Sequence, residues 1–207
     1  MTLLADYHRP LSEVLQEVAD LPSDRITVAE LVDRFGGRAM GALLLLFGLL
    51  CLLPLPPGGT TIFGLPLLLL APQLVIGRHA PWLPQRVRLR AVPLDDMRGR
   101  MPRLIRWLKR VEGISQPRLT FMFGPVGERL IGIVCTILAF VLILPIWGGN
   151  ILPALAVTVL SLSLILKDGV LALVGYALVA ISGTVLALAA HIILRMMQHA
   201  WIVVTGA

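Results

Sequence analysis

The sequence predicts an all-α integral membrane protein, and three observations lead to that fold class. Hydrophobic residues make up 57% of the chain and charged residues 14%, whereas soluble domains carry about 45 to 50% and about 25%. Two tracts, residues 39–77 and 130–166, contain no Asp, Glu, Lys, Arg or His. A third apolar segment runs from Val170 to about Leu194 and is long enough to span a bilayer once. We therefore expect all three segments to lie in lipid.

Each charge-free tract is too long for one straight crossing. The first has 39 residues, which as one helix would extend roughly 58 Å, about twice the roughly 30 Å of a bilayer core. Proline and glycine stop a helix, so clusters of them mark where the chain turns. These Pro/Gly knots are formed by Pro54, Pro56, Pro57, Gly58 and Gly59 in the first tract and by Pro145, Gly148, Gly149 and Asn150 in the second. Each tract is thus predicted to form a helical hairpin.

The arms of the first hairpin, Ala39–Leu53 and Ile62–Ile76, have 15 residues each, where a spanning helix needs about 20. This shortness favours re-entrant hairpins whose knots stop inside the bilayer. Irregular backbone at that depth is tolerated only against protein or a water-filled cavity, so re-entry implies a polar site. The alternative is a pair of full crossings through a thin membrane, with polar ends reaching the interface.

The two tracts resemble each other in sequence. Three residues of the first tract region recur 91 positions later: Arg38, Gly41 and Pro54 correspond to Arg129, Gly132 and Pro145. A Gly-Gly pair also follows each of these prolines. We interpret the match as an internal duplication. The repeats are parallel if both tracts enter and leave on one side, whereas an inverted arrangement needs an odd crossing between them or an oppositely inserted partner subunit.

The charge distribution sets the expected topology. Residues 78–118 hold 11 Lys or Arg against three acidic residues, a net charge of +8, which exceeds the +6 of the whole chain. By the positive-inside rule this linker is cytoplasmic, and Arg25, Arg34 and Arg38 place the N-terminal helices on the same side. The predicted parts are N-terminal helices in 1–37, hairpins in 38–78 and 129–168, a basic linker in 79–128, and a transmembrane helix with a short tail in 169–207.

A basic amphipathic helix is predicted within the linker. Its apolar face consists of Met97, Met101, Leu104, Leu108 and Val111, and its basic positions are Arg98, Arg103, Arg106 and Arg110. Such a helix is typical of binding to anionic lipid. Nucleic acid is the other partner of basic patches, but the position between two membrane tracts argues against it.

Two short amphipathic helices are expected before the first tract. In the first, Leu11, Val14, Leu15 and Val18 fall at helical spacing. The second begins with Thr27 and Glu30 in capping-box register and ends at Gly36-Gly37. These helices either lie on the membrane domain or form a hairpin that binds a partner.

No catalytic residue, cofactor or metal site is expected. His8, His79, His191 and His199 are scattered, and the chain has no HExxH motif, nucleophile elbow or Walker loop. Cys51 and Cys135 both lie in apolar runs and lack metal-binding spacing. The sequence therefore argues against an enzyme.

Two strings in the tracts carry a resemblance to a known family. They are LLPLPPGGTTIFGLPLLLLAPQLVIGR, around Pro54 to Thr61, and GERLIGIVCTILAFVLILPIWGGNILPALAV, around Pro145 to Asn150. Both resemble the signature blocks of the ExoD family of bacterial inner-membrane proteins, over about Leu11 to Leu194. Trp147 departs from the small residue or proline expected in the second block. The resemblance implies a multi-pass plasma-membrane protein connected with exopolysaccharide synthesis and tolerance of alkaline conditions, and it implies no reaction.

We weigh two functions beside that resemblance. In the first, the protein is a transporter or channel for a small solute or ion, and its path is lined by Pro54, Pro57, Gly58, Gly59, Thr60, Thr61, Pro145, Gly148, Gly149 and Asn150. Arg38 and Arg129 would be charge gates, or would only snorkel and set topology. Glu128 and Asp168 lie at the margins of the second tract. In the second function, the chain is a non-transporting scaffold for exopolysaccharide enzymes. Independently of its function, the chain is expected to form a homodimer.

Overall fold

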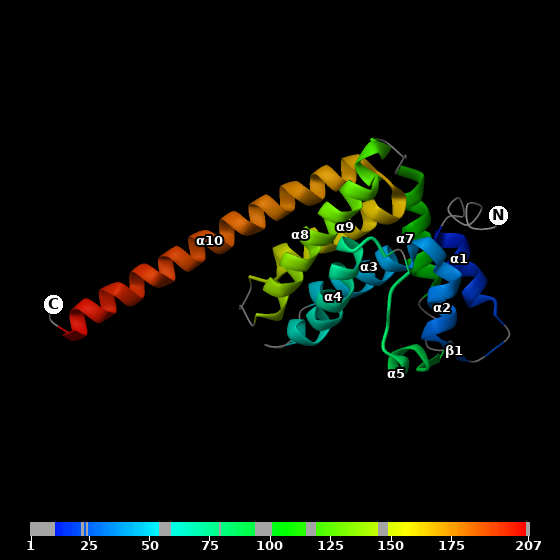
Figure 1. Cartoon of the computed structure of the whole chain (residues 1–207), viewed down its shortest axis with the longest axis horizontal. Coiled ribbons are helices and arrows are strands. Elements are labelled where there is room, and N and C mark those ends of the chain that lie inside the picture. Colours follow the sequence, from blue (N-terminus) through cyan, green and yellow to red (C-terminus); the bar gives the residue numbers. More distant parts are fainter. Residues whose placement is uncertain are drawn as a thin grey trace.

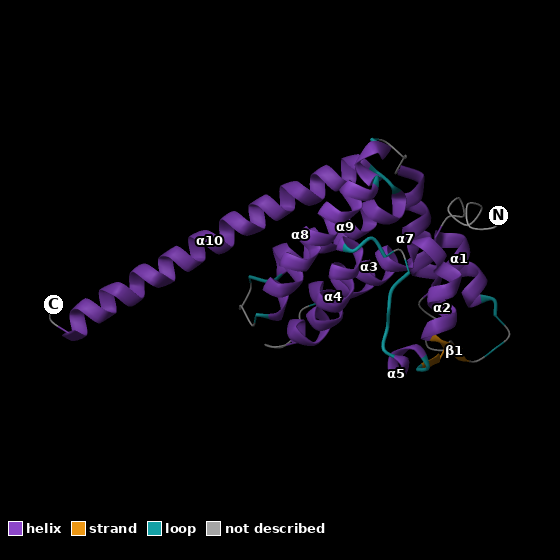
Figure 2. Ribbon diagram, viewed as in Figure 1, coloured by secondary structure: helices purple, strands orange, loops and turns teal. Residues whose placement is uncertain are grey.

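The computed structural model describes residues 11–21, 23, 25–53, 59–78, 80–93, 101–114, 119–144 and 149–205 (Figures 1 and 2). The long and medium helices are α1 (Leu11–Ala19), α2 (Val28–Phe35), α3 (Ala39–Leu52), α4 (Gly59–Val75), α7 (Met101–Ile114), α8 (Pro125–Ile143), α9 (Ile151–Leu166) and α10 (Gly169–Thr205). The short elements are β1 (Arg25–Thr27), η2 (Gly36–Arg38), α5 (Gln85–Arg88), β2 (Ala91–Pro93) and η3 (Thr120–Phe123). The predicted all-α class is confirmed, with one small strand pair that the sequence did not indicate.

Four helices, α3, α4, α8 and α9, form an antiparallel bundle (Figure 1). Among these four helices, the most extensive packing runs between the hairpins, with α3 against α9 and α4 against α8, and α10 packs on the outside of α9. We call the end where α3 and α8 begin the base end, and the end where α4 and α9 begin the tip end. The helices of each hairpin therefore pack more against the other hairpin than against each other.

Glycines set the close approach of these helix pairs. An ideal Cβ on Gly41 of α3 would lie 2.8 Å from the Ile165 Cγ1 of α9. An ideal Cβ on Gly132 of α8 would lie 2.9 Å from the backbone nitrogen of Val75, at the end of α4. Small residues allow such backbone contact between helices in lipid, where the hydrophobic effect does not drive helices together.

The helical arms agree with the sequence prediction to within three residues. The expected arms Ala39–Leu53 and Ile62–Ile76 correspond to α3 and α4. Pro66 and Pro72 lie inside α4 and do not end it. Both knots lie largely outside the described residues, which omit 54–58 and 145–148.

Within the described residues, three helices are long and apolar enough to cross a membrane: Val28–Leu52, Pro125–Ile143 and Gly169–Ile192. Shorter apolar helices are Gly59–Val75 and Ile151–Leu166. The bundle exposes large apolar side chains, such as Ile62 on α4 and Phe140 on α8, with 67% and 62% of their surface accessible. This pattern fits a lipid surround.

The residues before the first tract and those of the linker form one packed layer at the base end, which we call the outer layer (α1, β1, α2, α5, β2 and α7; Figure 1). Strands β1 and β2 pair antiparallel, with Ile26 opposite Val92. The carboxylate of Glu112 in α7 accepts bonds from the Ser12 hydroxyl at 2.6 Å and the Ser12 backbone N–H at 3.2 Å. The N-terminal helices therefore contact the linker.

The second short helix begins as its sequence indicates. The Thr27 hydroxyl accepts a bond from the Glu30 backbone N–H, and the Glu30 carboxylate accepts one from the Thr27 backbone N–H. This is a complete capping box. The helix stops at Gly36, whose φ of 52° is accessible to glycine.

Helix α7 buries part of its apolar face against protein. Ile105 and Leu108 are 5% and 2% exposed, and they pack in one cluster with Leu15 and Val18 of α1. Of the predicted apolar face, Met97 lies outside the described residues, and Leu108 is in this cluster. Arg106, Lys109 and Arg110 remain exposed.

The first apolar tract also contains a buried polar residue, Gln73 of α4, which is 8% exposed. Its amide nitrogen donates to the carbonyls of Leu69 and Trp82, both at 3.0 Å, and its amide oxygen accepts the Trp82 N–H at 2.6 Å. Gln73 thus attaches the start of the linker to the bundle.

Helix α10 is longer than predicted. The sequence indicated an end at Arg195 followed by a short tail, whereas the helix continues through His199, Trp201 and Val203 to Thr205. No glycine or proline interrupts residues 184–205, so nothing in the sequence stops the helix there. Its later half projects past the tip end of the bundle (Figure 1).

We predict that Gly132→Ala lowers the free energy of unfolding by about 1 to 3 kcal/mol, because its methyl group would press on the α4 backbone. Thermal unfolding in detergent, followed by tryptophan fluorescence, measures the change. Gly183→Ala is the matched control, because no atom lies within 4 Å of the added Cβ. Equal behaviour of the two variants would contradict the packing argument.

Candidate functional site

At the tip end, Asn150 joins three helices. It lies immediately before α9, and its amide nitrogen donates to Thr60 Oγ1 of α4 at 2.9 Å. The same nitrogen donates to the carbonyl of Leu144, just after α8, at 3.1 Å, and lies 3.5 Å from the carbonyl of Leu142. One side chain therefore connects the starts of α4 and α9 with the end of α8.

Thr61 adds a second bond across the tip end. Its hydroxyl donates to the carbonyl of Ile143, the last residue of α8, at 2.9 Å. The last carbonyls of a helix have no partner within the helix. Asn150 and Thr61 supply partners for those of α8.

Asn150 also carries an unsatisfied atom. The residue is 6% exposed, and its carboxamide oxygen Oδ1 is buried without a hydrogen bond to any described residue. A buried acceptor without a partner destabilises a structure by about 1 to 3 kcal/mol, so such atoms are uncommon. The tip end therefore holds spare acceptor capacity.

The predicted path residues meet only in part. Thr60, Thr61 and Asn150 lie together, and Gly59 and Gly149 stand beside them in the chain. The remaining predicted residues, Pro54, Pro57, Gly58, Pro145 and Gly148, lie outside the described residues.

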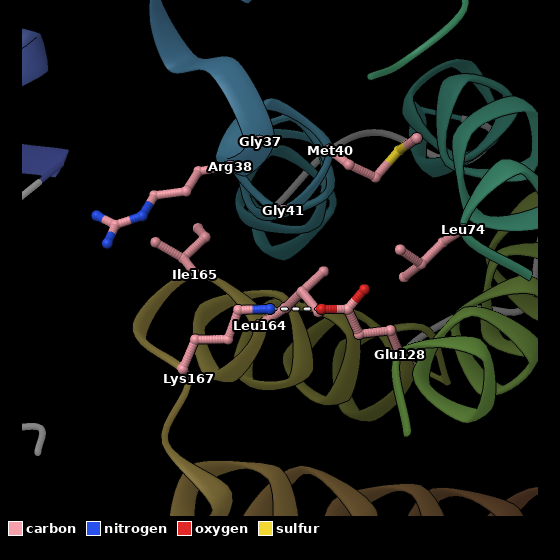
Figure 3. Close-up of a pocket in the computed structure, with 9 residues that line it drawn as sticks. All are labelled: Gly37, Arg38, Met40, Gly41, Leu74, Glu128, Leu164, Ile165 and Lys167. Carbon is pink, nitrogen blue, oxygen red and sulfur yellow. Dashed lines mark hydrogen bonds and ion pairs between the residues drawn. The ribbon is translucent and has the colours of Figure 1, made fainter. Parts of the chain in front are cut away.

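The base end contains a partly buried ion pair between Glu128 and Lys167 (Figure 3). Glu128 is in the first turn of α8 and is 8% exposed. Lys167 follows α9 and has a φ of 53°, and its ammonium lies 5.6 Å from the centre of the Phe123 ring. Ionisable side chains inside a membrane bundle are uncommon and mark functional sites.

All four bundle helices line a small cavity beside this pair. Its volume is about 10 Å³, which is room for about one water. It is lined by Gly37, Arg38, Met40, Gly41, Leu74, Glu128, Leu164, Ile165 and Lys167. A second hollow of about 280 Å³ adjoins Glu128 and is lined by Leu74, Gly77, Phe123, Pro125, Glu128 and Arg129. Glu128 therefore lines both the bundle interior and the larger hollow.

The two arginines predicted as gates lie at the base end, away from the tip residues. Arg38 lines the small cavity, but its guanidinium points away from the ion pair (Figure 3). Arg129 lines the larger hollow, and its guanidinium lies 3.7 Å from the Cβ position of Gly77. Because α3 has 14 residues, roughly 21 Å separates the two ends. The arginines and the knots thus do not form one site.

The sequence marked Glu128 only as an acid at the margin of the second tract and did not predict its pairing with Lys167. Both flank the second tract, where charges are expected at the interface, and 39 positions separate them. One signal in the sequence was a difference between the two repeats. The second repeat has charged residues, Glu128 and Lys167, at the positions where the first has Gly37 and Gly77. Asp168, the other marginal acid, accepts the Val170 N–H at 2.9 Å and caps α10.

Fold and site together define a helical membrane protein with polar contacts at both ends of an apolar bundle. Residues 11–188 match the family model described as exopolysaccharide synthesis, ExoD, and the chain belongs to this family. It is 30% identical over 168 residues to the uncharacterized protein slr1875 of Synechocystis, covering 78% of this chain and 79% of the relative. It is 28% identical over 177 residues to Protein ExoD of Rhizobium meliloti, covering 83% and 73%. No solved structure matches the chain.

Replacing Glu128 with alanine should destabilise the protein by about 2 kcal/mol, less than the roughly 3 to 5 kcal/mol for a fully buried pair. The reduction is expected because the Lys167 side chain is 29% exposed. Thermal unfolding in detergent measures this, and the double variant E128A/K167A should recover part of the loss.

The exposed ion pair between Glu17 and Arg34, at 2.9 Å, provides the control. Its side chains are 51% and 34% exposed, so Glu17→Ala should change stability by less than about 1 kcal/mol. If both alanine variants behave alike, the Glu128–Lys167 pair contributes no more than a surface contact.

Proposed function

We propose that this ExoD-family protein is a transporter or channel for a small solute or ion, with its path between the two hairpins. The observation that carries the proposal is the placement of polar side chains. Thr60, Thr61 and Asn150 lie at the tip end, and Glu128 and Lys167 lie at the base end of the same apolar bundle. Polar groups in such positions serve passage of solutes in membrane proteins.

Equivalent contacts in the two hairpins support an internal repeat. Gly41 meets Ile165 and Gly132 meets Val75, so each contact maps onto the other when positions shift by 90 or 91. Thr60 and Asn150 are 90 positions apart and bond to each other. In this proposal a pseudo-two-fold axis runs along the bundle, and the repeats are parallel.

The short lengths of α3, α4 and α9 support re-entrant hairpins, while α8 is long enough to cross. Helices α3, α4, α8 and α9 have 14, 17, 19 and 16 residues, or roughly 21 to 28 Å, against about 30 Å for a bilayer core. In the proposed arrangement the tip end stops short of the far surface. We place the protein in the bacterial plasma membrane with its outer layer in the cytoplasm, on the basis of its basic charge.

The flux prediction uses purified protein in proteoliposomes, with Na⁺, K⁺, H⁺ and inorganic phosphate as probes. Gly59→Leu and Gly149→Leu should reduce flux to the level of empty liposomes, because a large side chain at either tip position obstructs the path. Gly183→Leu on α10 is the control, since its Cβ position has no neighbour within 4 Å. Wild-type flux in both tip variants, with folding intact, would refute the proposed path.

A scaffold for exopolysaccharide enzymes is the second candidate, and one observation favours it. The charged side of α7 is exposed at Arg106, Lys109 and Arg110, while Leu108 packs on protein. The same positive surface is our proposed contact with anionic lipid.

For the oligomeric state, we propose a homodimer in which a second copy of the chain packs against α10.

If the scaffold is correct, replacing Arg98, Arg103, Arg106 and Arg110 with glutamine should abolish co-purification with exopolysaccharide synthesis enzymes. The Gly59→Leu variant should then retain those partners and polymer production. Replacement of four exposed arginines outside residues 98–110, Arg25, Arg86, Arg88 and Arg90, tests for a general charge effect. Loss of polymer in Gly59→Leu with partners retained would instead favour transport.

A further inference from the structure

Asn150 and Thr61 at the tip end keep their spare hydrogen-bonding capacity on acceptor atoms. The Asn150 amide protons are directed to Thr60 Oγ1 and the Leu144 carbonyl, and the Thr61 hydroxyl proton is directed to the Ile143 carbonyl. Each carbonyl oxygen has two lone pairs and therefore keeps one for another partner. Asn150 Oδ1 accepts nothing from the described residues.

The orientation of the Asn150 amide follows from its neighbours. The hydrogen-bond partners of Nδ2 among the described residues are three oxygens, two of them backbone carbonyls that can only accept. The amide nitrogen must face them, which leaves Oδ1 as the atom without a partner. Whatever satisfies Oδ1 must therefore bring a proton or positive charge.

The charge of the surroundings limits the ligand further. Residues 39–77 and 130–166 contain no charged side chain, and the charged residues of α8, Glu128 and Arg129, lie at the base end. None of these side chains therefore opposes a cation or attracts a divalent one at the tip end. Two helices, α3 and α8, end at this side of the bundle. In membrane transporters, the carbonyls of interrupted helices are the groups that coordinate alkali cations. Hard cations take oxygen ligands, and a cluster of amide, hydroxyl and carbonyl oxygens suits them.

We propose that Asn150 Oδ1, with the Thr60 and Thr61 hydroxyls and the terminal carbonyls of α8, binds an alkali metal cation. This inference rests on the proposed function and names its substrate class. The cation satisfies the buried amide oxygen that the described chain leaves without a partner.

The test measures binding without transport, in purified full-length protein. Melting temperatures are recorded in NaCl, KCl and choline chloride at one ionic strength. The wild type should melt roughly 3 °C higher in the preferred alkali salt than in choline chloride, because a ligand of the native state raises its stability. Identical melting in all three salts would overturn the proposal.

Two variants assign the effect to Asn150. Asn150→Leu should remove the salt difference, and Asn150→Asp should lower the half-maximal cation concentration by about tenfold, because it adds a negative charge at the site. The aspartate variant keeps the test decisive if the leucine variant does not fold. Ser182→Ala removes a second side-chain atom that is buried and unsatisfied among the described residues, on α10, and should keep the wild-type response. A salt response that Asn150→Asp leaves unchanged would place any cation elsewhere.

The binding experiment tests the cation site and the flux experiment tests transport, so each proposal can fail without the other. Cation-dependent melting without flux would establish the site and reject transport. Flux without cation-dependent melting would keep the transporter and reject the alkali cation as its bound substrate.

Discussion

Close backbone contact between the hairpins is the constraint on which the rest of the structure depends. Lipid provides no hydrophobic drive for helix association, so these helices must gain stability from packing. Gly41 and Gly132 allow that packing by removing the side chains that would hold α3 from α9 and α8 from α4. The same register brings Asn150 to Thr60 at one end and encloses Glu128 at the other.

Polar side chains follow one rule inside this bundle and another at its ends. Thr136, Thr158 and Ser161 return their hydroxyls to carbonyls of their own helices. Such bonds satisfy the hydroxyl in lipid without joining helices. Asn150, Thr61 and Glu128 instead bond across elements. The middle of the bundle is therefore held by apolar packing, and its ends by directional bonds.

Much of this fold could be predicted from the sequence because its signals are local. Proline and glycine clusters bounded the arms, and Thr27 with Glu30 marked the start of α2. The Glu128–Lys167 pair could not be found this way, since it depends on how α8 and α9 align across a turn. Strands β1 and β2 have three residues each, too few for a periodic pattern. Arg38 and Arg129 stand at the starts of α3 and α8, and the knots follow the ends of these helices, so the arginines lie far from the knots. The prediction of charge gates considered only the charges and not this separation.

The order of synthesis gives the pairing between hairpins a further meaning. Ser12 bonds to Glu112, which is synthesised 100 residues later. Thr61 bonds to Ile143, 82 residues later, and Thr60 bonds to Asn150, 90 residues later. The first half of the chain is therefore synthesised before the residues that it contacts in the second half. Contacts of such long sequence separation form late. Until the second hairpin has been synthesised, the glycine faces of the first have no partner helix from that hairpin, and misfolding or degradation is easiest in this interval.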